Sequence, residues 1–175
     1  MRMFFCSLGA IVIGIVLWCC KPLESYTDVL EVSFESLSFA DITSALGTEK
    51  RAVLVFSFAD GNGNLGVRTF NDSISKIHYT WYQKLPDGKY EAYQFISGTI
   101  TDSIAIPYRS VMDRDEAQNR LLKGKIEIAL SMPINPQNVD TMRIEYFIFD
   151  RSGKQSNVDH TPDFSILDTS ITIKK

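Results

Sequence analysis

The chain has 175 residues, a length that predicts a single domain. Hydrophobic residues make up 45% of it and charged residues 22%, which is ordinary for a globular protein and excludes a mainly disordered chain. The formal net charge of -3 excludes the strongly basic surface that nucleic-acid binding needs, so we expect no nucleic-acid partner.

The N-terminus has the layout of a secretory signal. Arg2 is the one charged residue before an uncharged, largely apolar run that ends at Trp18, and this order predicts a signal peptide. An uncleaved membrane anchor is the alternative. Such an anchor needs about 20 apolar residues, and this run is at the short limit and contains Gly9 and Gly14.

All 3 cysteines of the chain lie in this region, at Cys6, Cys19 and Cys20, so the remainder forms no disulfide of its own. The segment Leu17-Trp18-Cys19-Cys20 resembles the signals of bacterial lipoproteins, which place an aliphatic residue three positions before a lipid-modified cysteine and a small residue directly before it. The resemblance implies that residues 1–19 are removed and that Cys20 carries the lipid (palmitate). It also implies attachment to the cell envelope, at the outer membrane, because buried acyl chains hold a protein on a bilayer.

Residues 20–50 are mixed in character, and we interpret them as a lipid-anchored tether with a possible first strand near residues 29–34. Residues 51–175 are predicted to form a β domain. Its first expected strand, residues 52–58, is rich in β-branched and aromatic residues. That strand stops at residues 60–64, which are dense in turn formers.

Further strands follow as alternating patterns. Residues 76–84 place Tyr79 and Trp81 on one face, and alternation with period two predicts a strand with one buried face. The turn of a hairpin is predicted at Pro86-Asp87-Gly88-Lys89, with its second strand in residues 90–96. The other expected strands are residues 100–106, 124–130, 142–149 and one between 164 and 173.

About seven short strands separated by turns predict an antiparallel β-sandwich, with a barrel as the alternative. Phe58–Gly66 reads FADGNGNLG and resembles an F-x-D-G-D-G-D-L/I-G loop of small envelope lipoproteins of the Bacteroidota type. Phe149–Asn157 reads FDRSGKQSN and resembles a D-R-x-G turn that recurs in immunoglobulin-like and fibronectin-like modules. The resemblance covers most of the chain after Arg51. It implies an all-β fold, an antiparallel immunoglobulin-like β-sandwich, and no particular reaction.

The loop after the first strong strand is a candidate cation site. Asp60, Asn62 and Asn64 place oxygen-bearing side chains two residues apart between glycines, a spacing that suits a hard cation, and Asp72 follows nearby. We predict either a structural calcium site formed by these four residues or an Asn/Gly turn whose side chains bond their own backbone. The resembling lipoproteins carry acids where this chain has Asn62 and Asn64, so any affinity for calcium is expected to be weak. No other cofactor is expected.

The chain carries no recognisable catalytic motif. Its 2 histidines are His78, in an alternating strand, and His160. A Ser-His-Asp set can be assembled from His160 with Asp159 or Asp163, but proximity in one sequence is weak support for a triad. We interpret the His160 segment as a surface loop and predict that the protein is not an enzyme.

The aromatic residues of the predicted hairpin are the best signal for binding. Tyr79 and Trp81 share a face and are expected in the core, where Trp81 resembles the inward tryptophan of immunoglobulin-like sandwiches. Tyr82 and Tyr93 are the better candidates for a binding face, because aromatic rings stack on sugars and on partner side chains. Stabilisation of the sheet by cross-strand aromatic pairs is the alternative.

These features together predict a membrane-anchored, non-enzymatic accessory or binding module of the bacterial cell envelope, in contact with protein or glycan. The alternative is a structural spacer in an envelope assembly. A contiguous aromatic patch on the surface favours the first, and a wholly polar surface favours the second.

Overall fold

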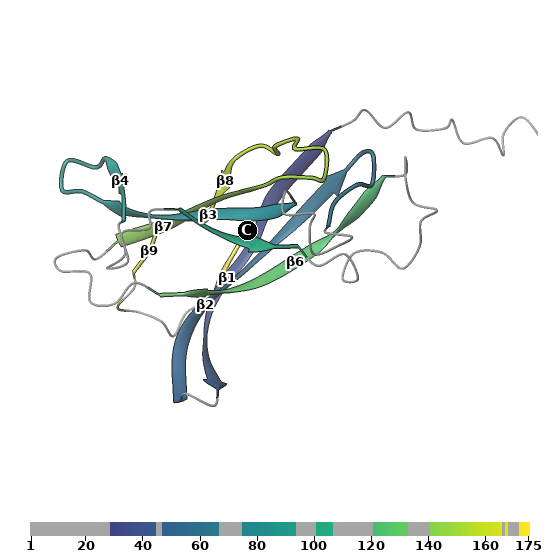
Figure 1. The fold of residues 1–175 in the computed structure, drawn as a ribbon. Helices are drawn as coiled ribbons and strands as arrows, with labels where there is room; N and C mark the ends of the chain where they lie inside the picture. Colours follow the sequence, from purple (N-terminus) through teal and green to yellow (C-terminus); the bar gives the residue numbers. More distant parts are fainter. Residues whose placement is uncertain are drawn as a thin grey trace, which may run out of the picture.

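The computed structural model describes residues 29–44, 47–66, 75–93, 101–106, 121–132, 141–165, 167 and 172–175. The regular structure in these ranges is β, arranged in two antiparallel sheets (Figure 1). The strands are β1 (Leu30–Ser44), β2 (Gly47–Asp60), β3 (Lys76–Lys84), β4 (Tyr90–Ala92), β5 (Thr101–Ala105), β6 (Leu122–Ser131), β7 (Thr141–Ile148), β8 (Asp159–His160), β9 (Phe164–Ser165) and β10 (Ile173–Lys174). The predicted signal, Cys20 and Asp72 lie outside the described residues.

The strand order is that of a two-layer antiparallel β-sandwich. One sheet has the order β10-β1-β2-β6, and the other has the order β4-β3-β7-β8, with β5 also paired to β3 and β9 to β7. The chain thus crosses to the second sheet at β3, returns to the first at β6 and crosses again at β7, a Greek-key connection. The prediction of an all-β antiparallel sandwich is confirmed.

A helix long and apolar enough to cross a membrane is not found among the described residues.

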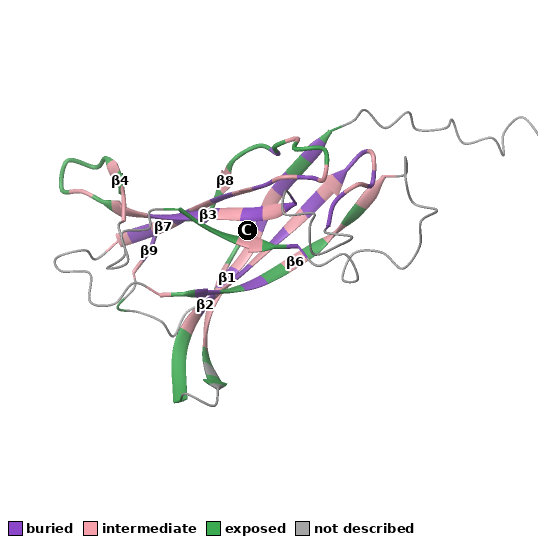
Figure 2. Cartoon of the chain, in the orientation of Figure 1, coloured by how far each residue is buried: buried purple, intermediate pink, exposed green. Residues whose placement is uncertain are grey.

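Alternating side chains from both sheets build one core. On β7, and on β2 from Arg51 onward, every second side chain is buried. The rings of Phe56 on β2 and Tyr146 on β7 meet between the sheets with centroids 4.8 Å apart, and Trp81 on β3 is fully buried, as expected. Each buried large apolar side chain stabilises the fold by about 1.5–3 kcal/mol. Figure 2 shows the buried segments concentrated in β1, β2, β3 and β7.

The folded domain begins earlier than the sequence indicated. β1 pairs with β2 along its whole length, and four of its side chains enter the core: Leu30, Val32, Phe34 and Leu37. Residues 30–44 and 47–50 lie in the segment interpreted above as a tether with a possible first strand, and they form paired strands of the first sheet. The sandwich therefore starts no later than Leu30 rather than at Arg51. The alternation of buried and exposed residues in β1 is weak because a β-bulge between Phe34 and Ser36 shifts the buried positions by one residue.

Two side chains, those of Asn157 and Asp159, cover the N-terminal part of the outer edge of β1, ahead of the residues that pair with β10. Asn157 accepts a hydrogen bond from the Val32 N–H at 2.8 Å and donates one to the Val32 carbonyl at 3.0 Å. The Asp159 carboxylate accepts from the Phe34 N–H at 2.7 Å. Since Asp159 belongs to β8, which pairs with β7, these bonds imitate a strand ladder and join the two sheets at this edge.

Candidate functional site

The outward side of the β3–β7 pair carries a row of aromatic and charged side chains. Side chains alternate along a strand, so the residues between the buried positions point away from the core. The register sets them opposite one another in pairs. We call this surface the outer face, and its members are His78–Phe147, Thr80–Glu145 and Tyr82–Arg143, with Phe149 after β7 at one end and Tyr90 of β4 at the other.

One end of the outer face is a packed aromatic group. The rings of His78 and Phe147 are stacked, with centroids 5.1 Å apart and an interplanar angle of 5°. Phe149 meets both edge-on, at 5.3 Å from His78 and 5.6 Å from Phe147. Burial, and to a smaller extent the charge of Lys76, lower the pKa of His78 below its usual value. The imidazole therefore stays neutral at physiological pH and acts as a third aromatic ring.

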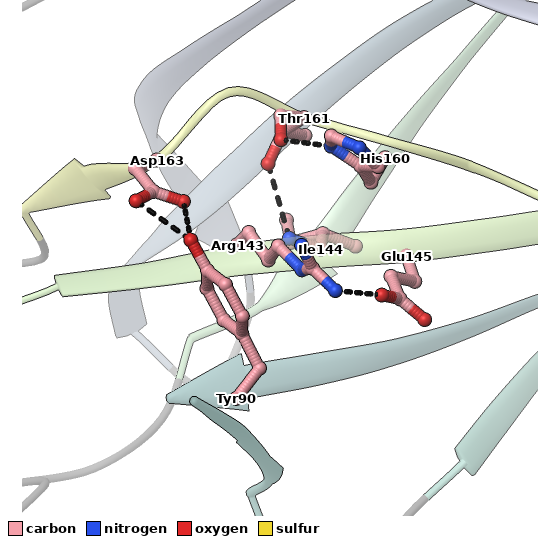
Figure 3. A network of polar contacts seen from close by, with 7 residues as sticks. All are labelled: Tyr90, Arg143, Ile144, Glu145, His160, Thr161 and Asp163. Carbon is pink, nitrogen blue, oxygen red and sulfur yellow. Dashed lines mark hydrogen bonds and ion pairs between the residues drawn. The ribbon is translucent and has the colours of Figure 1, made fainter. Parts of the chain in front are cut away.

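The other end of the outer face is an arginine between two tyrosines, Tyr82 and Tyr90. The Arg143 guanidinium carbon lies 3.7 Å from the ring centroid of Tyr90 (Figure 3) and 5.7 Å from that of Tyr82, within the range of cation–π attraction. Arg143 also forms an ion pair with Glu145. Its Nε is buried and has no hydrogen-bond partner among the described residues. The guanidinium is therefore held in place by its neighbours while one donor stays unused.

Asp163 links this end of the outer face to the segment before β9 through polar contacts. The Tyr90 hydroxyl donates to both oxygens of Asp163, at 2.6 and 2.8 Å, and the Lys84 ammonium lies 2.8 Å from the same carboxylate. Although burial raises the pKa of Asp163, the bonds from Lys84 and Tyr90 bring it below its usual value. The carboxylate is therefore ionised at neutral pH, and β3, β4 and the segment before β9 are joined at one point.

The two tyrosines proposed for binding lie on different sides of the sheet. Tyr82 is on the outer face, half-buried. Tyr93 packs against the core, and its N–H donates to the Trp81 carbonyl at 2.7 Å. Tyr90 instead shares the outer face with Tyr82, and Arg143 contacts both rings. The signal that identifies Tyr90 is the turn, because a three-residue Pro-Asp-Gly loop with Gly88 at a positive φ of 83° sets Lys84 opposite Tyr90 and so places Tyr90 outward.

His160 makes a local contact, whereas its acidic neighbours bond to other parts of the fold. The Nδ1 atom of His160 lies 2.8 Å from the Thr161 carbonyl oxygen. Of the two acids considered as its partners, Asp159 bonds Phe34 and the Tyr146 hydroxyl, and Asp163 bonds Lys84 and Tyr90. The hydrogen bonds of this segment thus hold the sandwich together and do not link histidine to carboxylate.

In the Asp60 loop (residues 60–66), side chains accept hydrogen bonds from the backbone of the loop itself. Asp60, which is 1% exposed, accepts hydrogen bonds from the N–H groups of Asn62 at 3.2 Å and Leu65 at 2.8 Å. Asn62 in turn accepts one from the Asn64 N–H at 3.2 Å. Burial raises the pKa of Asp60, and the charge of Asp150 raises it further, against the backbone hydrogen bonds that lower it.

A second turn lies against this loop. In the Asp150 turn (residues 150–154) the Asp150 Oδ1 atom accepts from the Ser152 hydroxyl at 2.6 Å and from the Lys154 N–H at 2.8 Å. The Arg151 N–H donates to the Asn64 carbonyl at 3.4 Å. The two loops singled out by resemblance are therefore neighbours in the fold. The described residues hold no group of three or more His, Cys, Asp or Glu side chains placed to bind a metal ion.

The opposite side of the sandwich is different in character. A shallow groove of about 440 Å³ crosses the outer side of β1, β2 and β6. The outward-pointing side chains that line it are small or charged: Glu31, Ser33, Ser57, Ala59, Lys123 and Lys125. The aromatic and arginine side chains of the outer face have no counterpart among them.

Comparison with known proteins gives no guide to the site: the chain matches no protein-family model, and no curated protein or solved structure is significantly similar to it.

Proposed function

We propose that this protein is a lipid-anchored, non-enzymatic binding module of the bacterial cell envelope, and that its outer face contacts another envelope protein. One observation carries the binding role: aromatic rings and an arginine are gathered on one side of the sandwich, whereas the outward side chains that line the groove on the other side are small or charged. Aromatic residues and arginine are enriched at protein interfaces, whereas lysine, glutamate, serine and alanine are depleted there.

The geometry favours a protein over a glycan as the partner. A sugar ring stacks on an open aromatic face, but the Arg143 guanidinium covers one face of Tyr90, and His78 covers one face of Phe147. Each of these two rings therefore has one face already occupied by a neighbouring side chain. Such a surface suits irregular packing by protein side chains, and the orphan Arg143 Nε offers a donor to a partner carbonyl once the surrounding side chains move aside.

A photo-crosslinking amino acid tests the binding role in the native envelope. A benzophenone-bearing phenylalanine at Phe147 samples the outer face, and the same group at Val55 samples the opposite side as the matched control. We expect adducts from position 147 that disappear when Tyr82 and Tyr90 are both changed to alanine. A protease-sensitive adduct identifies a protein partner, and a protease-resistant one a glycan. Absence of adducts, or equal adducts from both positions, favours the spacer alternative.

The anchor rests on the resemblance of residues 17–20 to lipoprotein signals, and it has a separate test. Cys20→Ser should leave a precursor of full length that takes up no labelled fatty acid, while Cys6→Ser should be processed and labelled normally. Labelling that persists in the Cys20→Ser variant contradicts the assignment. The anchor and the binding role can therefore fail independently.

A further inference from the structure

Two buried side-chain oxygens at one end of the sandwich find no hydrogen-bond partner among the described residues. They are Asn64 Oδ1, in the Asp60 loop, and Asp150 Oδ2, in the Asp150 turn. Asp150 is fully buried, at 0% exposed. A carboxylate oxygen in that position is costly unless a proton, a water molecule or a cation compensates it, so Asp150 Oδ2 is an acceptor that a bound cation could use.

The two oxygens belong to loops that touch. The Arg151 N–H donates to the Asn64 carbonyl at 3.4 Å. This bond places Asn64 next to Arg151, the residue that follows Asp150. Asp60, also buried, begins the same loop as Asn64. Each of the two touching loops therefore contributes a buried carboxylate.

Both loops take their shape from their own hydrogen bonds. Asp150 uses Oδ1 to bind its turn, which leaves Oδ2 free. Asp60 accepts from the backbone of its loop, and a carboxylate oxygen that accepts one hydrogen bond retains a second lone pair. The Asn62 side chain accepts from the Asn64 N–H and so orients the loop. The remaining acceptors are thus held in place by the protein itself.

We propose that Asp60, Asn64 and Asp150 form a cation site for calcium that bridges the Asp60 loop and the Asp150 turn. The donors are all oxygen, which suits a hard cation, and calcium tolerates the irregular arrangement of two loops better than magnesium, which requires near-octahedral geometry. The site differs from the one expected along the sequence, because Asn62 shapes the loop and Asp150 supplies the second carboxylate. It goes beyond the proposed binding role and is independent of it.

A cation at this position ties the two sheets together. The Asp60 loop follows β2 in the first sheet, and the Asp150 turn follows β7 in the second. With only two carboxylates and one amide, the affinity should be low, with a dissociation constant of about 10⁻⁴ to 10⁻³ M, as in extracellular modules. Calcium should therefore stabilise the fold without any part in a reaction.

The test is thermal unfolding of the full-length protein in detergent, with calcium, magnesium or a chelator, together with calorimetric titration of calcium. We expect calcium to raise the melting temperature saturably and magnesium to raise it less. Asp150→Asn should weaken calcium binding at least tenfold, although the asparagine keeps the Oδ1 acceptor that holds the turn. In chelator, the same variant should melt at or above the temperature of the unmodified protein, because a buried charge has been removed.

Asp87→Asn is the matched control, since Asp87 accepts from the Lys89 N–H at 3.0 Å in an exposed turn of similar kind. It should leave the calcium response unchanged. If Asp150→Asn fails to fold, Asn64→Ala gives a second test, because it removes an orphan oxygen and keeps every backbone bond of the loop. The proposal is overturned if calcium leaves the melting temperature of the unmodified protein unchanged, or if both variants respond to calcium as it does.

Discussion

His78 should make the stability of the fold depend on pH. Its pKa lies below the ordinary value of 6.5 because it is partly buried and close to Lys76, so on acidification the unfolded chain takes up the proton before the folded chain does. The stabilising effect of neutral His78 is complete above pH 6.5 and decreases as the pH falls toward the lower folded-state pKa. Thermal unfolding between pH 7.5 and about 5 should show this loss.

His78→Phe should abolish the loss of stability in that window, because phenylalanine keeps the stack on Phe147 and does not titrate. His160→Gln is the control, since His160 is exposed and outside the stack. It should leave the pH dependence as it is. An unchanged pH profile in His78→Phe would assign the dependence to another group.

Substitutions at Gly88 should change stability only through the strain of the backbone conformation. Its φ is +83°, and a Cβ built there meets nothing within 4 Å, so a substitution costs only the strain of the left-handed conformation. We expect Gly88→Ala to lower the free energy of unfolding by roughly 1–2 kcal/mol and Gly88→Asn to lower it by less, because asparagine tolerates this conformation. Urea unfolding measures both. Equal losses in the two variants would mean that strain at φ is not the cause.

At the scale of elements, the edge of β1 depends on side chains of the β8 segment. Asn157→Ala removes both hydrogen bonds to Val32 and leaves a partly buried backbone N–H and carbonyl without them. The free energy of unfolding should fall by about 1–3 kcal/mol. Hydrogen exchange provides the local measurement, since the Val32 amide should lose protection while amides in the centre of β7 keep theirs at the reduced global stability.

Gln155→Ala is the control for that experiment, because Gln155 is exposed and pairs with Phe149 through its backbone. It should leave the protection of Val32 unchanged. If Val32 exchanges alike in both variants, the edge of β1 is held by other contacts.

At the scale of the whole molecule, the position of β1 decides what a minimal folding unit contains. β1 contributes one strand of the first sheet and four core side chains. A chain that begins at Arg51 should therefore fail to unfold cooperatively, whereas a chain that begins at Val29 should give a β-rich circular dichroism spectrum and one sharp transition. A cooperative transition for the shorter chain would show that β1 is dispensable.

The sequence by itself determined those features that a local pattern of residues encodes. Period-two alternation in residues 76–84 and 142–149 identified strands and put Trp81 in the core, because the direction of a side chain depends only on its own strand. The turn of Asp60, Asn62 and Asn64 was likewise foreseeable as one of two alternatives, since its bonds join residues within five positions.

Only the tertiary structure decided which distant residues meet. The bulge in β1 interrupts its alternation, so β1 could be predicted only as a possible strand near residues 29–34, and its pairing with β2 establishes its full length. The hairpin register places Tyr93 and Tyr82 on different sides of the sheet. The closeness of Asn64 and Arg151 follows from the crossing of the chain between two sheets, and no local pattern encodes that crossing. Contacts of this kind depend on the topology of the fold, so they can be identified only from the arrangement of both sheets.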